Sequence, residues 1–171
     1  MLAAMRNAIL LLSVVVTFFG CKFGSSDAAF FSGDISTRNA RLAALPLERQ
    51  WELFKYGNQV QHPPATGLAE PIAPHGRSAV VFILDDLDRN GRDLDFRDSL
   101  VVFQAIQRHG YFDICSDHAF MDRIRANEAR IKSDQWRSVY AELRVQLCLR
   151  PPGRAQRDSG ERGDSTTRST A

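Results

Sequence analysis

The chain has 171 residues, of which 44% are hydrophobic and 25% are charged, and its formal net charge is +2. This length and composition suit one globular domain with additional terminal segments. The charge is mild, and no dense stripe of Lys and Arg with interleaved aromatic residues accompanies it, which argues against a nucleic-acid-binding protein.

The first segment of the chain has the pattern of an export signal. Arg6 precedes an uncharged apolar run over residues 8–19, and Gly20 and Cys21 follow that run. The run is about 12 residues long, which is typical of a signal peptide and shorter than the roughly 20 residues that a membrane-spanning helix needs. We therefore predict a signal peptide over residues 1–20.

The end of this segment resembles a bacterial lipoprotein signal, in which a small residue precedes a lipidated cysteine that becomes the first residue of the mature chain. Gly20 and Cys21 match those two positions, whereas the two preceding phenylalanines depart from the residues that the family prefers. The resemblance implies a lipid anchor on Cys21 and a location in the periplasm, and Lys22 favours the outer membrane. The alternatives are a signal cut after Ala28, giving a soluble periplasmic or secreted protein, and an uncleaved anchor.

The number of cysteines agrees with export. The chain contains three, and an odd number in an exported protein calls for an explanation. Lipidation of Cys21 would provide one, because Cys115 and Cys148 are then free to form a disulfide bond in an oxidising compartment.

The segments on either side of the central region lack the features of folded structure. Residues 21–40 are rich in Gly, Ser and Asp without a sustained period, which predicts a flexible tether. Residues 151–171 contain no aromatic residue and no Leu, Ile or Val, which predicts a disordered tail. The domain is therefore expected over residues 41–150.

The central region is predicted to be all α. Apolar residues recur there at helical spacing, without convincing strand alternation. The first predicted helix begins near Pro46 and ends before His62. The other five cover approximately residues 65–73, 79–88, 96–108, 117–131 and 134–148. We expect a compact bundle of about six short helices in antiparallel hairpins.

The last predicted hairpin brings two cysteines together. Antiparallel helices of nearly equal length place the start of the first beside the end of the second, and Cys115 and Cys148 stand at those ends. We predict a disulfide bond between them, with two independent buried thiols as the alternative. The same cysteines with His109 and His118 match no compact zinc site, and an exported pair more readily oxidises, so no metal site is predicted there.

The polar segment between the third and fourth predicted helices opens like a calcium-binding loop. Asp86, Asp88 and Asn90 stand at the alternate positions that carry oxygen ligands, and Gly91 follows them. The twelfth position needs a bidentate Glu, but Arg97 occupies it and brings a positive charge. We interpret the segment as a polar turn between helices, and we keep a calcium site at the first three residues as the less favoured alternative.

The same region resembles a single HEAT-type repeat over residues 76–103. An apolar helix is followed by a turn at Gly91, and a second helix opens with Asp93, Asp95 and Arg97. In that family, acidic and Arg residues near the turn commonly form a hydrogen-bonded ladder. The resemblance implies a HEAT-like bundle of helical hairpins, in which Arg97 bonds a carboxylate or carbonyl group near this turn or the preceding one.

The sequence contains no recognisable catalytic motif. We found no nucleophile elbow, glycine-rich phosphate loop or zinc-protease helix, and we predict no catalytic residue and no cofactor. The function that we predict is an exported, lipid-anchored, non-catalytic binding or scaffold protein of the bacterial envelope, with an unidentified envelope protein as its partner. The alternatives are a secreted soluble enzyme or inhibitor that uses residues 109–118, and a calcium-dependent module that uses residues 86–98.

Overall fold

A computed structural model describes residues 25–149, and this part of the chain is all α. Seven α-helices and four short 3₁₀ helices make it up, with no strand among the described residues. The predicted fold class is therefore confirmed. The predicted signal peptide, the predicted lipidation site Cys21 and the predicted tail lie outside the described residues.

The α-helices follow the predicted periodicity closely in the second half of the chain. They are α1 (Ser25–Ser32), α2 (Arg38–Ala43), α3 (Leu47–Gln59), α4 (Arg77–Asn90), α5 (Asp93–His109), α6 (His118–Asn127) and α7 (Asp134–Leu149). The 3₁₀ helices are η1 (Thr66–Ala69), η2 (Ala73–His75), η3 (Ile114–Ser116) and η4 (Glu128–Arg130). The helix predicted over residues 65–73 is divided into η1 and η2, because Pro71 stands between them and cannot donate a backbone hydrogen bond.

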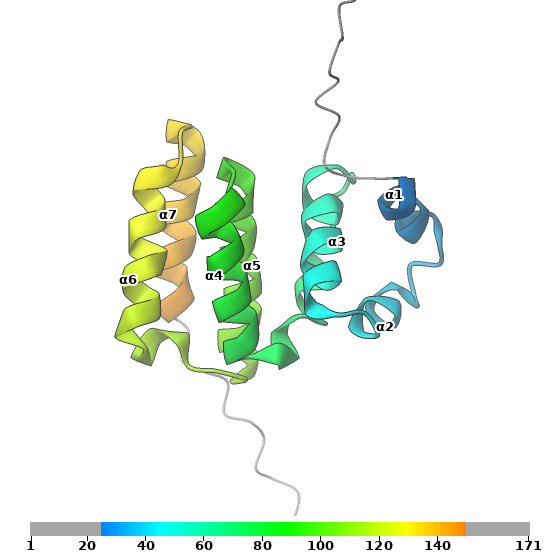
Figure 1. Cartoon of the computed structure of the whole chain (residues 1–171), viewed down its shortest axis with the longest axis horizontal. Coiled ribbons are helices and arrows are strands. Elements are labelled where there is room, and N and C mark those ends of the chain that lie inside the picture. Colours follow the sequence, from blue (N-terminus) through cyan, green and yellow to red (C-terminus); the bar gives the residue numbers. More distant parts are fainter. Residues whose placement is uncertain (1–24, 150–171) are drawn as a thin grey trace, which may run out of the picture.

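Two helical hairpins stack side by side in the second half of the domain. The α4–α5 hairpin packs against the α6–α7 hairpin, with α5 beside α7 and α4 beside α6 (Figure 1). Helix α5 lies at the centre of the core, where Leu100, Phe103 and Ile106 are fully buried. Tyr140 of α7 is also fully buried, and its hydroxyl group donates to the carbonyl oxygen of Ile124 at 2.8 Å. The apolar stripes of the hairpins thus form one continuous core.

Helices α1 and α2 correct the prediction of a flexible tether over residues 21–40 for its described part, residues 25–40. The side chain of Phe31 is buried, and its ring centroid lies 5.2 Å from that of Tyr56 in α3. Arg38 donates to the carbonyl oxygen of Phe31 at 3.0 Å, and Arg41 donates to that of Phe30 at 2.9 Å. The Gly and Ser content of this segment suggested disorder, but Phe31 is buried and the adjacent Phe30 packs against the core. Burial of this apolar surface favours the ordered helices.

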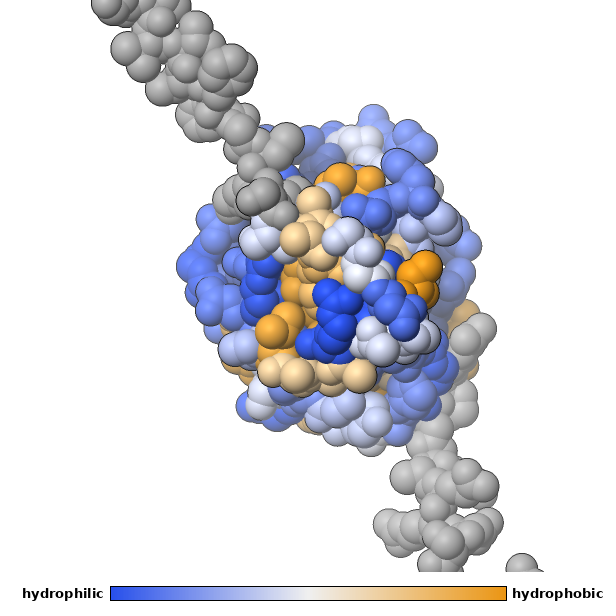
Figure 2. Space-filling view, turned by 90° about the vertical axis from the view of Figure 1, so that its right-hand side faces the viewer, coloured by the Kyte–Doolittle hydropathy of each residue, from blue (hydrophilic) through white to orange (hydrophobic). Residues whose placement is uncertain are grey.

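The face formed by α1 and α2 combines apolar and charged surface. Figure 2 shows hydrophobic residues in the middle of this face with strongly hydrophilic residues among them. Ile35 is the most exposed large hydrophobic residue here, with 74% of its surface accessible. Within residues 25–149, no helix is both long and apolar enough to span a membrane.

Candidate functional site

A groove of about 600 Å³ runs between α1, α3 and α4. Its lining combines charged residues of both signs with the aromatic side chains of Trp51 and Phe82. Helix α3 provides most of one wall, because its polar face looks away from the core that its apolar face covers.

The floor of the groove is a hydrogen-bonded group of three side chains. The indole Nε1 of Trp51 donates to Oδ2 of Asp86 at 2.8 Å, and Nζ of Lys55 donates to the same oxygen at 3.0 Å. The Lys55 amine also lies 5.0 Å from the centroid of the Trp51 ring. Partial burial raises the pKa of Asp86, but the Trp51 hydrogen bond and the Lys55 charge outweigh it, so this pKa lies below its usual range. The floor is therefore a fixed ion pair whose charges balance each other.

The two ends of the groove carry opposite charge. Asp27, Glu48 and Glu52 line the groove along the first two turns of α3, with Arg49 as the one cation among them. Arg49 pairs with Asp27 and, at 2.9 Å, with Glu52. At the other end stand Arg89 and Arg92.

Two of these charged side chains have no partner within the described part of the chain. Glu48 and Arg89 are both exposed, and they make no hydrogen bond or ion pair with residues 25–149. They belong to opposite ends of the groove. The groove therefore presents an unpaired carboxylate at one end and an unpaired guanidinium group at the other.

The three residues of the less favoured calcium alternative do not share one site. Asp86 and Asn90 are four positions apart on α4 and both line the groove, where Asn90 hydrogen-bonds Asp86. Asp86 faces α3, whereas Asp88 accepts hydrogen bonds from Arg123 at 2.6 Å and from Arg130 at 2.7 Å. Helix α4 continues to Asn90, and Asp88 stands two positions from both Asp86 and Asn90, so its side chain does not face theirs. Among the residues that the structure describes, no group of three or more His, Cys, Asp or Glu side chains is arranged to hold a metal ion.

The predicted turn residues Gly91 and Asp95 shape the junction between α4 and α5. The N–H group of Gly91 closes α4 by donating to the carbonyl oxygen of Leu87 at 2.9 Å. A Cβ atom at Gly91 would lie 2.7 Å from that oxygen and 2.8 Å from the Phe96 ring, so a larger residue would force the turn apart. Asp95 accepts the N–H of Arg92 at 3.1 Å and so caps the start of α5.

Asp93 joins the turn of one hairpin to the turn of the next. Its carboxylate accepts the backbone N–H groups of Lys132 at 3.0 Å and Ser133 at 2.8 Å, just before α7 begins. These backbone hydrogen bonds lower the pKa of Asp93. Of the two acidic residues at the start of α5, Asp95 therefore caps its own helix, whereas Asp93 bonds the neighbouring hairpin.

Arg97 bonds a carboxylate near this turn, and that carboxylate belongs to a buried polar network that was not predicted from the sequence. Nε of Arg97 donates to the carboxylate of Asp98 at 2.9 Å, and Asn58 and Gln59 of α3 donate to the same carboxylate at 2.9 and 2.8 Å. Gln59 also donates to Asp95 at 2.8 Å. Complete burial of Asp98 raises its pKa, although the Arg97 charge and these hydrogen bonds oppose the shift. The network ties α3 to α5.

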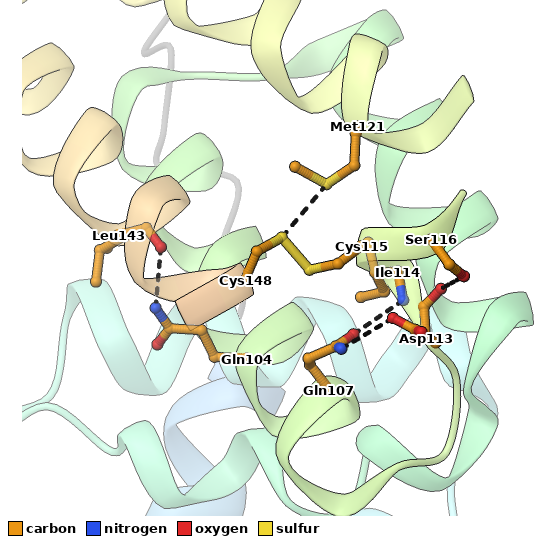
Figure 3. Close-up of a disulfide and its surroundings, with 9 residues drawn as sticks. All are labelled: Gln104, Gln107, Asp113, Ile114, Cys115, Ser116, Met121, Leu143 and Cys148. Carbon is orange, nitrogen blue, oxygen red and sulfur yellow. Dashed lines mark hydrogen bonds between the residues drawn. A yellow bond between two sulfur atoms is a disulfide. The ribbon is translucent and has the colours of Figure 1, made fainter. Parts of the chain in front are cut away.

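The predicted cysteine pair lies at disulfide distance in the structure. The sulfur atoms of Cys115 and Cys148 are 2.04 Å apart, joining η3 to the end of α7 (Figure 3). Gln107 supports this junction, because its side chain donates to Asp113 at 3.0 Å and accepts the N–H of Ile114 at 2.9 Å. The bond joins the segment before α6 to the end of α7, which are the two ends that the predicted antiparallel hairpin brings together.

Residues 109–118 form the segment that the alternative function, a secreted enzyme or inhibitor, would use. This segment lies next to η1. Nε2 of His109 lies 2.6 Å from Oε2 of Glu70, and Arg108 pairs with the other oxygen of the same carboxylate. The Tyr111 ring lies 5.7 Å from the His109 ring and is half exposed. His118 begins α6 and is exposed. The alternative stays a prediction.

The charged groove was not predicted from the sequence. One signal was present, since Glu48 and Glu52 are four residues apart on a predicted helix and so share a face. The partners across the groove come from α4, more than 30 residues later, and nothing local indicates that they lie opposite. No protein-family model, curated protein or solved structure matches the chain.

Proposed function

We propose that the chain is an exported, lipid-anchored and non-catalytic binding or scaffold protein of the bacterial envelope, and that the groove between α1, α3 and α4 is its binding face. The observation that carries the proposal is the pairing of Cys115 with Cys148. A structural disulfide favours an oxidising compartment such as the periplasm. The third cysteine of the sequence, Cys21, stands at the position that a lipoprotein signal requires.

The charges in the groove support binding over catalysis. A general base works best with a pKa near the operating pH, whereas the pKa of Asp86 is lowered and its carboxylate is occupied by Trp51 and Lys55. Unpaired charges at the ends of a groove instead provide electrostatic complementarity for a charged partner. The stacked hairpins hold the wall formed by α4 in a fixed position.

The lipid anchor is tested by metabolic labelling with a palmitate analogue in a bacterial host. We expect the full chain to incorporate label and Cys21→Ser to lose it, whereas Cys148→Ser, which leaves Cys21 in place, should retain it. Label that persists on Cys21→Ser would refute the anchor.

The binding role is tested by crosslinking envelopes and purifying the full chain with its partners. We expect one envelope protein to co-purify in stoichiometric amounts and to be lost from a Glu48→Lys/Arg89→Glu variant, which keeps the net charge and reverses the ends of the groove. The matched control Asp122→Lys/Arg125→Glu reverses an exposed ion pair on α6 and should retain the partner. Equal recovery from both variants would show that the groove is not the binding face.

A further inference from the structure

The distance between the charged ends of the groove between α1, α3 and α4 can be estimated from the length of α3. The acidic end begins at Glu48, in the first turn of α3. The basic end includes Arg92, whose guanidinium group donates to the side-chain oxygen of Gln59 at 3.3 Å. Gln59 is the last residue of α3. The eleven steps from Glu48 to Gln59 correspond to roughly 16 Å along a helix that rises about 1.5 Å per residue. Glu48 and Arg92 are therefore separated by nearly the whole length of α3. Arg92 also pairs with Asp95 at 3.2 Å, so Arg89 is the unpaired cation at this end among the described residues.

The middle of the groove adds little net charge. Lys55 and Asp86 neutralise each other there, and Trp51 is 1% exposed, so its ring offers almost no surface for stacking. The half-buried Phe82 provides apolar surface between the ends. A ligand would thus meet charge at its two ends and a neutral, partly apolar surface between them.

We propose that the groove binds a short extended peptide segment with a positive charge at one end and a negative charge about four residues away. Extended chain advances at most about 3.3 to 3.6 Å per residue, so charges four or five residues apart span the roughly 16 Å of the groove. The cation of the peptide contacts Glu48 and Glu52, and its anion contacts Arg89 and Arg92. A compact ion, or a peptide whose two charges are adjacent, reaches only one end.

This inference rests on the proposed binding role, but it concerns the ligand alone. It needs neither the lipid anchor nor a location in the envelope. Its failure would leave the palmitate labelling of Cys21 unchanged, and a failure of that labelling would leave peptide binding unchanged.

The test uses two end-blocked pentapeptides of identical composition at low ionic strength. The probe is Lys-Ser-Ser-Ser-Glu, and the comparison peptide is Ser-Ser-Lys-Glu-Ser, in which the charges are adjacent. Binding to the full chain is followed by chemical-shift changes in nuclear magnetic resonance spectra. We expect the probe to bind about tenfold more tightly, since engaging the second end adds roughly 1.4 kcal/mol, and to shift the signals of both groove walls.

Variants locate the effect. Glu48→Gln/Arg89→Gln removes the two unpaired charges without breaking any interaction among the described residues, and we expect it to abolish the preference for the probe. The matched control Asp122→Asn/Arg125→Gln removes one acid and one base on α6 and should keep the tenfold preference. Equal binding of the two peptides, or a preference that survives Glu48→Gln/Arg89→Gln, would overturn the proposal.

Discussion

Removing the disulfide between Cys115 and Cys148 should destabilise the domain by an amount that its position allows us to calculate. The two residues are 33 positions apart. A bond across a loop of this length lowers the conformational entropy of the unfolded chain, which corresponds to a stabilisation of roughly 3.7 kcal/mol at 25 °C. Folded domains of this size are stable by about 5–15 kcal/mol, so the bond supplies a large share. Cys148 is exposed and Cys115 is half-buried, so replacing both by Ala leaves little cavity to add to this cost.

The measurement is equilibrium unfolding in urea, followed by circular dichroism. A Cys21→Ser background leaves one possible disulfide, and Cys115→Ala/Cys148→Ala is introduced into it. We expect a lower urea midpoint for the variant. We also expect its free energy of unfolding to fall more steeply with urea concentration, because the unfolded chain without the bond is less compact. Reductant should move the parent protein to the midpoint of the variant and should leave the variant unchanged.

Two results would contradict this reasoning. The first is a loss below about 1 kcal/mol, which would mean that the folded domain holds the two ends together without benefit from the bond. The second is the titration of two reactive thiols in the exported, denatured Cys21→Ser protein without reductant. That result would show that the cysteines are not paired in the cell, and it would also remove the main support for an oxidising compartment.

Two further predictions concern the polar links between elements. Asp93→Asn should lose about 0.5–2 kcal/mol at neutral pH, because the backbone N–H groups of Lys132 and Ser133 lose a charged acceptor. The pKa of Asp93 is lowered in the folded state, so this contribution is present above the unfolded pKa near 3.8 and is lost as the pH falls through the folded value; urea midpoints of Asp93→Asn and parent that fail to converge in acid would contradict this. Asp98→Ala should cost about 3–5 kcal/mol in urea unfolding, because Arg97 loses its buried partner, and a cost below about 1 kcal/mol would show that water replaces the network.

The helices of this domain could be predicted from the sequence where apolar residues repeat along one face of the helix. The apolar stripes of α4, α5 and α7 repeat at helical spacing, and the structure places these helices within a few residues of the predicted bounds. The cysteine pair was equally accessible, since it depends only on the lengths of α6 and α7. Both inferences use periodicity and chain geometry, which are local properties of the sequence.

The same reasoning failed where a residue's role depends on a distant partner. Composition suggested a tether over residues 21–40, because nothing nearby indicates that Tyr56 provides a surface for Phe31. Asp98 was not singled out, because its donors Asn58 and Gln59 lie about 40 positions earlier in the chain, at the end of α3. A polar residue is usually assigned to solvent unless its partner is known.

The polar segment between α4 and α5 shows why spacing alone cannot assign a cation site. Alternate acidic residues converge on a cation only when the chain between them forms a loop, but α4 continues through Asp86, Asp88 and Asn90. On a helix, the same spacing sends Asp86 toward the groove and Asp88 toward Arg123 and Arg130. The carboxylates thus connect three layers of the domain: Asp86 holds α3, Asp88 holds the α6–α7 hairpin, and the core of α4 lies between them. A neutral substitution at either position should therefore loosen one neighbour and leave the other in place, which is the behaviour of a junction between helices and not of a shared site.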